Sequence, residues 1–468
     1  MHAYDEDLTQ QVMGHLLDRL RLDPPPLGRL GEHEELALAL KDAIGTGPRR
    51  PADVLRTYTD ALEPTVVSCD HPAFLAFVPG APTKAAALFD MVLSASSLHG
   101  VSWLEASGAV AAENQVLRLF ADLAGMPQGA GGCFVSGGSA GNLSALIVAR
   151  DTGRRRLGLT ATAPVRIAVS DQVHSSVGNT LRIIGVEPLV VPTSDHRLTG
   201  TALAAALGTA SADGGAPVVA VVATAGTTNA GIVDDLDGVA EQARAHDLWL
   251  HIDAAYGGAA LFVPELRARL RGIEHADSLV VDPHKWMFAP FDCGALLYRE
   301  PHLARAVHTQ DASYLDAIHG ADGADHDADW NPSDYAYHLT RRPRGLPLWF
   351  SLAVHGTDAY RDAVARGAEI ARYTARLVEA TDNLDLLREP ELTVVLIRRT
   401  GWGPEDYYAW SKRLLASGLA FVTPSVWEGE TVARLAFLHP GITEETVRAI
   451  IASLADEPGH GPGAPERP

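Results

Sequence analysis

The sequence contains few cysteines: Cys69, Cys133 and Cys293 are the only three in 468 residues. They lie far apart and form no CxxC pair, which argues against a disulfide framework and against a cysteine-based zinc site. We therefore expect buried, unreactive thiols and no bound metal.

Long apolar runs and an excess of positive charge are also missing. No uninterrupted apolar stretch approaches the length that crosses a bilayer, and the first residues lack the basic start and apolar segment of a secretory signal. The formal charge of −20 would repel nucleic-acid phosphates and anionic lipids. These absences predict a cytoplasmic protein that binds neither nucleic acid nor membranes.

Short β-branched runs alternate with helical patterns through the middle of the chain. This alternation predicts an α/β fold, in which helices cover a mainly parallel sheet and ligands bind at the carboxyl ends of the strands. Strands are expected at 165–170, 217–223, 248–252, 279–281 and 294–298, and a helix is expected at 233–246.

The pattern also suggests domain boundaries. Residues 1–83 should form an N-terminal helical segment, interrupted by prolines at 24–26 and too small to hold a core of its own. Residues 84–343 would form a large domain and 344–458 a small C-terminal domain of helices and strands. The end, 459–468, is rich in proline and glycine and predicts a disordered tail.

The run VDPHKW at 281–286 places Lys285 directly after an expected strand and a proline turn, among apolar and aromatic residues. Desolvation lowers the pKa of a lysine and makes its amine nucleophilic, as Schiff-base chemistry requires. Taken alone, a structural lysine remains the simpler interpretation.

A carboxylate ends another expected strand, in the run LHIDAAY at 250–256. His251 and Asp253 are two residues apart and should project to the same side of the strand. Asp253 could keep the pyridine nitrogen of a cofactor protonated. The alternatives are a helix cap, or a metal pair with His251 that lacks a convincing third ligand.

Two polar turns follow other expected strands. The glycine-rich run SGGSAGN at 136–142 opens a helical pattern, and such a turn offers backbone N–H groups to a phosphate. It matches neither the P-loop nor GxGxxG, so a flexible turn is the alternative. In SDQVHSS at 170–176, His174 could stack on a planar cofactor and contact a substrate carboxylate, or it could cap a helix.

Together these features resemble the group II amino-acid decarboxylases that depend on pyridoxal 5'-phosphate (PLP), the family of the aromatic-L-amino-acid decarboxylases. The resemblance extends from about residue 71 to 350. It implies the aspartate-aminotransferase fold (fold type I), a PLP cofactor and conversion of an L-amino acid to its amine and CO2. The segments that carry it are HPAFLAFVPG, SDQVHSSVG, VVATAGTTNAG, WLHIDAAYGG, ADSLVVDPHKWMFAPFDCGALLY and DASYLD.

The resemblance implies a role for each matching residue. Lys285 is similar to the Schiff-base lysine, Asp253 to the partner of the pyridine nitrogen, and His174 to the residue stacked on the ring. Asp282 departs from the family, in which asparagine is usual, and its negative charge beside the phosphate predicts that it is turned away or protonated. The other cofactor positions are Gly137, Gly138, Ser139, Thr228, Ala255 and His284, with Ser139 and His284 on the phosphate side.

The family further implies a homodimer with its active sites at the subunit interface. Its N-terminal helices embrace the partner subunit, which would explain a first segment without a core. A tyrosine on a mobile loop protonates the carbanion that CO2 leaves, and Tyr314 matches it. The expected catalytic residues are therefore Lys285, Tyr314, His174 and Asp253.

The substrate is the least defined part of the resemblance. Aromatic decarboxylases usually carry threonine at Gly80, isoleucine at His99 and phenylalanine at Val101, yet no arginine stands in these stretches for an acidic substrate. A neutral aromatic or bulky apolar amino acid is the expected substrate. The alternatives are an aldehyde synthase of the same fold, which typically has phenylalanine at the loop tyrosine, and a non-catalytic PLP-binding protein. The implied side-chain pocket comprises Phe77, Val78, Pro79, Gly80, His99, Val101 and Trp103.

Overall fold

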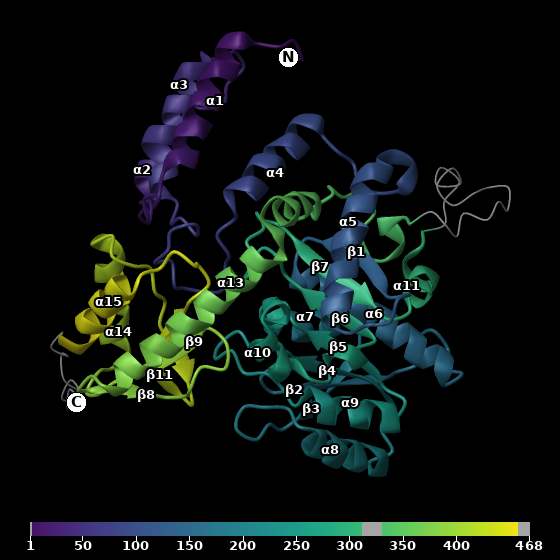
Figure 1. Ribbon diagram of the computed structural model, residues 1–468. Coiled ribbons are helices and arrows are strands. Elements are labelled where there is room, and N and C mark those ends of the chain that lie inside the picture. The colour runs from purple at the N-terminus through teal and green to yellow at the C-terminus, as the bar shows by residue number, and fades with distance from the viewer. Residues whose placement is uncertain (1, 311–329, 457–468) are drawn as a thin grey trace, which may run out of the picture. The chain divides into compact units, whose positions relative to one another are not determined.

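The computed structural model describes residues 2–310 and 330–456 (Figure 1). The chain divides into two compact units. The larger unit comprises Val78–Glu369 and Pro390–Val394, and the smaller one comprises Met1–Phe77, Ile370–Glu389 and Val395–Pro468.

A seven-stranded sheet forms the centre of the larger unit. Its strands are β1 (Gly131–Val135), β2 (Arg166–Ser170), β3 (Glu187–Val191), β4 (Val218–Thr224), β5 (Trp249–Asp253), β6 (Ser278–Val281) and β7 (Gly294–Tyr298), in the order β1-β7-β6-β5-β4-β2-β3. Neighbours from β6 to β3 are parallel, and β7 is antiparallel to both β6 and β1. The mainly parallel sheet is thus confirmed, and each predicted strand is correct to within one residue because the β-branched runs coincide with buried strands.

Helices cover this sheet, and α6 packs across β4, β5, β6 and β7 (Figure 1). The predicted helix at 233–246 begins only at Leu236, because the Asp235 side chain caps it by accepting a hydrogen bond from the N–H of Gly238. The helices are α4 (Lys84–Ser96), α5 (Trp103–Leu123), α6 (Gly138–Arg156), α7 (Ser175–Ile183), α8 (Gly200–Ala212), α9 (Leu236–Ala245), α10 (Pro264–Arg267), α11 (Pro301–His308) and the first part of α13 (Leu346–Glu379).

The sheet brings distant segments of the sequence to one edge. Strand β1 runs in the same direction as β2, β4, β5 and β6, because β7 is antiparallel to both of its neighbours. The carboxyl ends of these five strands therefore meet at the same edge. The glycine-rich turn, His174, Asp253 and Lys285 all follow or end one of these strands.

The smaller unit holds a second sheet in the order β10-β11-β9-β8. In helix α1, the described structure buries no residue, and its apolar side chains Leu8, Val12, Met13 and Leu17 are exposed. The elements are α1 (Glu6–Arg21), α2 (His33–Leu40), α3 (Pro51–Thr57), the end of α13, β8 (Leu384–Leu386), β9 (Val394–Arg399), α14 (Pro404–Ala416), β10 (Ser425–Trp427), β11 (Glu430–Ala436) and α15 (Glu444–Asp456).

The three cysteines agree only partly with the prediction of buried thiols. Cys133 and Cys293 are buried, and burial raises the pKa of Cys133 to about 12, so that thiol stays protonated. Cys69 is only half-buried, so the prediction of full burial is wrong for it.

None of the helices in residues 2–310 and 330–456 has an apolar stretch long enough to span a bilayer.

Candidate active site

Lys285 lies on a tight turn that leaves β6. The backbone N–H of Lys285 donates to the carbonyl of Asp282 at 2.9 Å, and its Nζ lies 3.1 Å from Asp282 Oδ2. The lysine side chain is 19% exposed, whereas that of Asp282 is 2% exposed. Asp282 is therefore directed toward the lysine, and its expected orientation or protonation beside a bound phosphate stays a prediction. Its second oxygen, Oδ1, has no hydrogen-bond partner among the described residues.

His284 lies beside this pair with a defined tautomer. Its Nδ1 accepts a hydrogen bond from the N–H of Cys293 at 3.0 Å, so the proton of the neutral ring is on Nε2. Burial lowers the pKa of His284, which favours this neutral form. The Nε2 lies 3.6 Å from Asp282 Oδ2 and can donate to an anion at this point.

The glycine-rich turn after β1 faces the same residues. A Cβ on Gly138 would lie 3.0 Å from both the Ala255 Cβ and Asp282 Oδ2, and a Cβ on Gly137 would lie 3.0 Å from the His284 ring. Glycine is needed here because backbone approaches these side chains closely. No described side chain caps the start of α6, so its first N–H groups remain available to an anion.

Asp253 ends β5 as predicted and is 5% exposed. Its Oδ1 accepts from the N–H of Ala255 at 3.1 Å, and its Oδ2 accepts from Asn142 Nδ2 at 2.8 Å. The same amide contacts His251 through Oδ1 at 2.9 Å, which confirms that His251 and Asp253 project to one side of the strand. Both nitrogens of His251 are engaged, because its Nδ1 contacts Ser278 Oγ at 2.8 Å.

His174 precedes α7 and caps it. Its Nδ1 accepts from the N–H of Ser176 at 3.2 Å and lies 2.8 Å from Ser176 Oγ. His174 also lines a cavity of about 580 Å³ with Ser136, Ser139 and Tyr337. The Nδ1 atom of His174 thus caps the helix, as the alternative interpretation of this histidine predicted. The rest of the ring faces the cavity.

The remaining predicted cofactor positions differ in exposure. Ser139 is exposed in the first turn of α6, and Thr228 is exposed in the turn after β4. Ala255 is 7% exposed, and its carbonyl accepts from the N–H of Asp282 at 3.0 Å. Ala255 is therefore linked directly to the lysine turn.

The predicted substrate residues fall into separate places. Val78 and Gly80 are buried in the larger unit, where the N–H of Gly80 donates to the carbonyl of His284 at 3.0 Å. Pro79 between them is half-buried, whereas Phe77 belongs to the smaller unit and is exposed. The first group of predicted substrate residues, 77–80, thus contacts the lysine turn through Gly80, within the larger unit.

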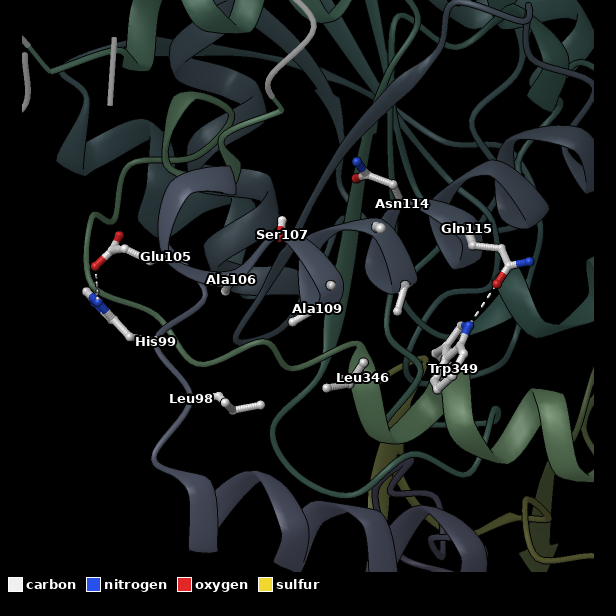
Figure 2. A pocket seen from close by; sticks show the side chains of 13 residues that line it. Leu98, His99, Glu105, Ala106, Ser107, Ala109, Asn114, Gln115, Leu346 and Trp349 are labelled. Atoms are coloured by element: carbon white, nitrogen blue, oxygen red, sulfur yellow. Dashed lines mark hydrogen bonds and ion pairs between the residues drawn. The ribbon is translucent and has the colours of Figure 1, made fainter. Parts of the chain in front are cut away.

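The second segment lies at a different cavity, of about 900 Å³ (Figure 2). His99 points toward Glu105 there, with Nδ1 and Oε1 2.9 Å apart. Val101 is buried, and the half-buried Trp103 donates its N–H to Asn331 Oδ1 at 2.9 Å. This cavity shares no lining residue with the one at His174.

Tyr314 lies outside the described residues. Within the described ranges, no group of three or more histidine, cysteine or acidic side chains is arranged to hold a metal. Sequence reasoning did not identify Asn142 and Ser176 as site residues, although both stand in the runs that were singled out. No local pattern could have found Asn142, because its partners Asp253, His251 and Ser176 lie on other elements, whereas the Ser176 contact with His174 two residues away is local.

The comparisons with known proteins agree with this geometry. Residues 35–399, well over half of the chain, match the family described as "Pyridoxal-dependent decarboxylase conserved domain". An aromatic-L-amino-acid decarboxylase of Bacillus atrophaeus is 29% identical over 466 residues, covering 96% of this chain and 95% of the relative. An L-2,4-diaminobutyrate decarboxylase of Rhizobium meliloti (strain 1021) is 32% identical over 405 residues, covering 85% and 79%.

A solved structure of TDC from Oryza sativa, with PLP and tryptamine, superposes with a TM-score of 0.88 at 25% identity, covering 97% of this chain and 99% of that one. The match supports fold type I for the whole described chain. Family, relatives and fold agree on a PLP-dependent decarboxylase. The chain therefore belongs to the PLP-dependent group II amino-acid decarboxylases, and it is a carboxy-lyase that uses PLP.

Proposed function

We propose that this decarboxylase converts a neutral aromatic or bulky apolar L-amino acid to its amine and CO2. The supporting observation is the composition of the segment 77–80 beside the lysine turn, which is apolar and has no cationic residue of its own, and in which Val78 and Gly80 are buried. The Bacillus relative and the plant TDC support an aromatic substrate, whereas the Rhizobium relative supports a diamino acid.

A substrate panel tests the proposal. The PLP-loaded enzyme is incubated with each common amino acid, DOPA and 2,4-diaminobutyrate, and amine, aldehyde and CO2 are measured together. We expect amine and CO2 in equal amounts from tryptophan, tyrosine, phenylalanine or DOPA. Turnover of glutamate or 2,4-diaminobutyrate alone would refute the aromatic preference, and aldehyde in place of amine would favour a synthase.

The residues at the sheet edge fit PLP. Gly137 and Gly138 leave room where a Cβ would collide, the uncapped start of α6 offers N–H groups to a phosphate, and His284 Nε2 can donate beside them. In this proposal Lys285 would meet the aldehyde carbon of PLP and Asp253 its ring nitrogen. When bound, PLP supplies an electron sink for the Cα–carboxylate bond that breaks.

The protein supplies orientation and charge around that sink. The Lys285 amine would hold the cofactor covalently until a substrate amine displaces it. Asp253 would hold a proton at the ring nitrogen, since its carboxylate is buried and aligned by Asn142 and Ala255. His174 would cover one face of the ring, while Ala255 and Thr228 lie nearby. Which bond breaks depends on how these residues orient the substrate carboxylate.

Asp282→Asn is expected to tighten PLP binding by about tenfold, or about 1.4 kcal/mol. The substitution removes a buried negative charge that lies 3.0 Å from the Cβ position of Gly138, beside the proposed phosphate site. The dissociation constant is measured by absorbance titration. Pyridoxal, which lacks the phosphate, is the control ligand, and its affinity should change less than that of PLP. An equal change for both ligands would place the effect on Lys285 alone.

Tyr314→Phe is expected to retain CO2 release but to form at least about tenfold less amine. A phenol can deliver a proton to Cα as a general acid, and such transfers contribute about 10²–10⁴-fold. Without that proton, O2 is consumed, and aldehyde, ammonia and hydrogen peroxide appear in place of the amine. Amine, peroxide and oxygen uptake are measured on the same sample. Unchanged amine yield without oxygen uptake would mean that Tyr314 only packs its segment.

We also propose a cytoplasmic homodimer with the active sites at its interface. The exposed apolar side chains of α1 support a partner surface, since an interface would bury them. All three cysteines are free, which suits a reducing compartment. The mass of the protein in solution tests the dimer.

A further inference from the structure

Asn142 lies fully buried in the second turn of α6, with its amide between two of the proposed cofactor contacts. Its Nδ2 lies 2.8 Å from Asp253 Oδ2 and 3.0 Å from Ser176 Oγ. Ser176 in turn contacts His174 Nδ1. One side-chain amide therefore joins the carboxylate at the end of β5 to the histidine before α7.

The hydrogen positions in this group follow from its chemistry. A carboxylate only accepts, so Asn142 must present its NH2 to Asp253, and its second hydrogen goes to Ser176 Oγ. Ser176 is then an acceptor from Asn142, and its own hydroxyl hydrogen is free to go to His174 Nδ1 at 2.8 Å. The Ser176 N–H also donates to Nδ1. His174 Nδ1 is therefore without a proton, and the neutral ring carries its proton on Nε2.

The contacts of Asn142 Oδ1, the other end of the side-chain amide, give the hydrogen bonds the same direction. Asn142 Oδ1 accepts from His251 Nε2 at 2.9 Å, so His251 Nδ1 must accept, and Ser278 Oγ donates to it at 2.8 Å. Ser278 accepts from Trp249 Nε1 at 2.8 Å. Burial lowers the pKa of His251 to about 4, so the ring is neutral near pH 7 and carries the single proton that this arrangement needs.

We propose that Asn142 is a positioning residue that orients the Asp253 carboxylate and, through Ser176, fixes His174 as the tautomer protonated on Nε2. The hydrogen bonds then run in one direction, from Trp249 through Ser278, His251, Asn142 and Ser176 to His174. His174 presents an N–H donor to the cavity that it lines with Ser139, and a substrate carboxylate is the kind of group that accepts from it. Only the identity of that acceptor depends on the proposed function.

The tautomer can be measured directly. The PLP-loaded protein is labelled with ¹⁵N in its histidine rings, and long-range ¹H–¹⁵N correlation distinguishes protonated from unprotonated ring nitrogens. His174 is assigned from a His174→Gln sample. We expect unprotonated Nδ1 and protonated Nε2 at pH 7.5, and the same result without PLP. A proton on Nδ1 of the parent protein would overturn the proposal.

Two variants separate the branches of the network. Ser176→Ala removes the hydroxyl donor to His174 but leaves the Asn142–Asp253 contact, whereas Asn142→Leu removes both. The backbone N–H of residue 176 still donates to Nδ1 in both variants, so each should keep the Nε2-protonated form but shift the ¹⁵N resonance of Nδ1, which reports the altered hydrogen bond from the hydroxyl. Asn142→Leu should also lower kcat by about 10–100-fold, the range typical of residues that orient functional side chains. Ser176→Ala should raise KM more than it lowers kcat, because it leaves Asp253 in place.

The matched control is Ser144→Ala, on the same helix, equally buried and bonded to residues outside the network. It should leave the His174 signals unchanged. If Asn142→Leu does not fold, Ser176→Ala still decides the question, and an unchanged ¹⁵N resonance of His174 Nδ1 in that variant would refute the coupling. Failure to bind PLP would refute the proposed function but not this tautomer, which is also read without the cofactor.

Discussion

Lys285→Ala is expected to abolish covalent attachment of PLP and essentially all turnover. The parent protein should be yellow, and borohydride reduction should fix PLP to Lys285 alone. The chain suits this test because it has only three other lysines, Lys41, Lys84 and Lys412, all of them exposed. Lys285 differs from these in being 19% exposed and paired with a buried carboxylate.

The measurement is peptide mapping of the reduced protein, together with its absorbance spectrum. Lys84→Ala is the matched control, since it removes an exposed lysine and should leave the reduced adduct and the spectrum unchanged. A reduced adduct on another lysine in the parent protein would overturn the assignment of Lys285.

Asp253→Ala is expected to lower kcat by about two to three orders of magnitude, or about 3–4 kcal/mol, as loss of other preorganised charge-stabilising groups does. The proposed role of the carboxylate is to hold a proton at the ring nitrogen, an interaction that strengthens as negative charge develops toward the transition state. The affinity for PLP should change far less, because phosphate and lysine contacts remain. Single-turnover rates at saturating PLP measure the effect.

Asp253→Asn is the control for shape. It can keep one hydrogen bond to the Ala255 N–H but lacks the negative charge, so it should be nearly as slow as the alanine variant. Near-normal turnover of either variant at saturating PLP would contradict the role of the charge. If only the alanine variant were slow, the carboxylate would act through packing instead.

The sequence predicted those features of the structure that depend on residues close together in the chain. The runs that form β4 and β5 are apolar and β-branched, so their bounds follow from the pattern, and the chemistry at the ends of parallel strands follows from the topology. The resemblance then supplied roles for Lys285 and Asp253, which the sheet places at one edge.

The network around Asn142 could not be predicted in this way. Its members come from α6, β5, β6 and the start of α7, and they meet only because the sheet order brings these elements together. An asparagine in the second turn of a helix has no local signature for contacting a carboxylate 111 residues away. The direction of Asp282 was likewise beyond the pattern, because it depends on the turn that pairs it with Lys285.

Gly80 limits how the substrate preference of this enzyme can change. A Cβ on Gly80 would lie 1.6 Å from the carbonyl oxygen of Lys285. A threonine at this position therefore cannot be introduced by one substitution, because its Cβ would displace the turn that carries Lys285. In evolutionary terms, residue 80 and the lysine turn must change together. We expect a threonine introduced at residue 80 alone to displace the turn of Lys285 and to be lost by selection before it could alter substrate choice.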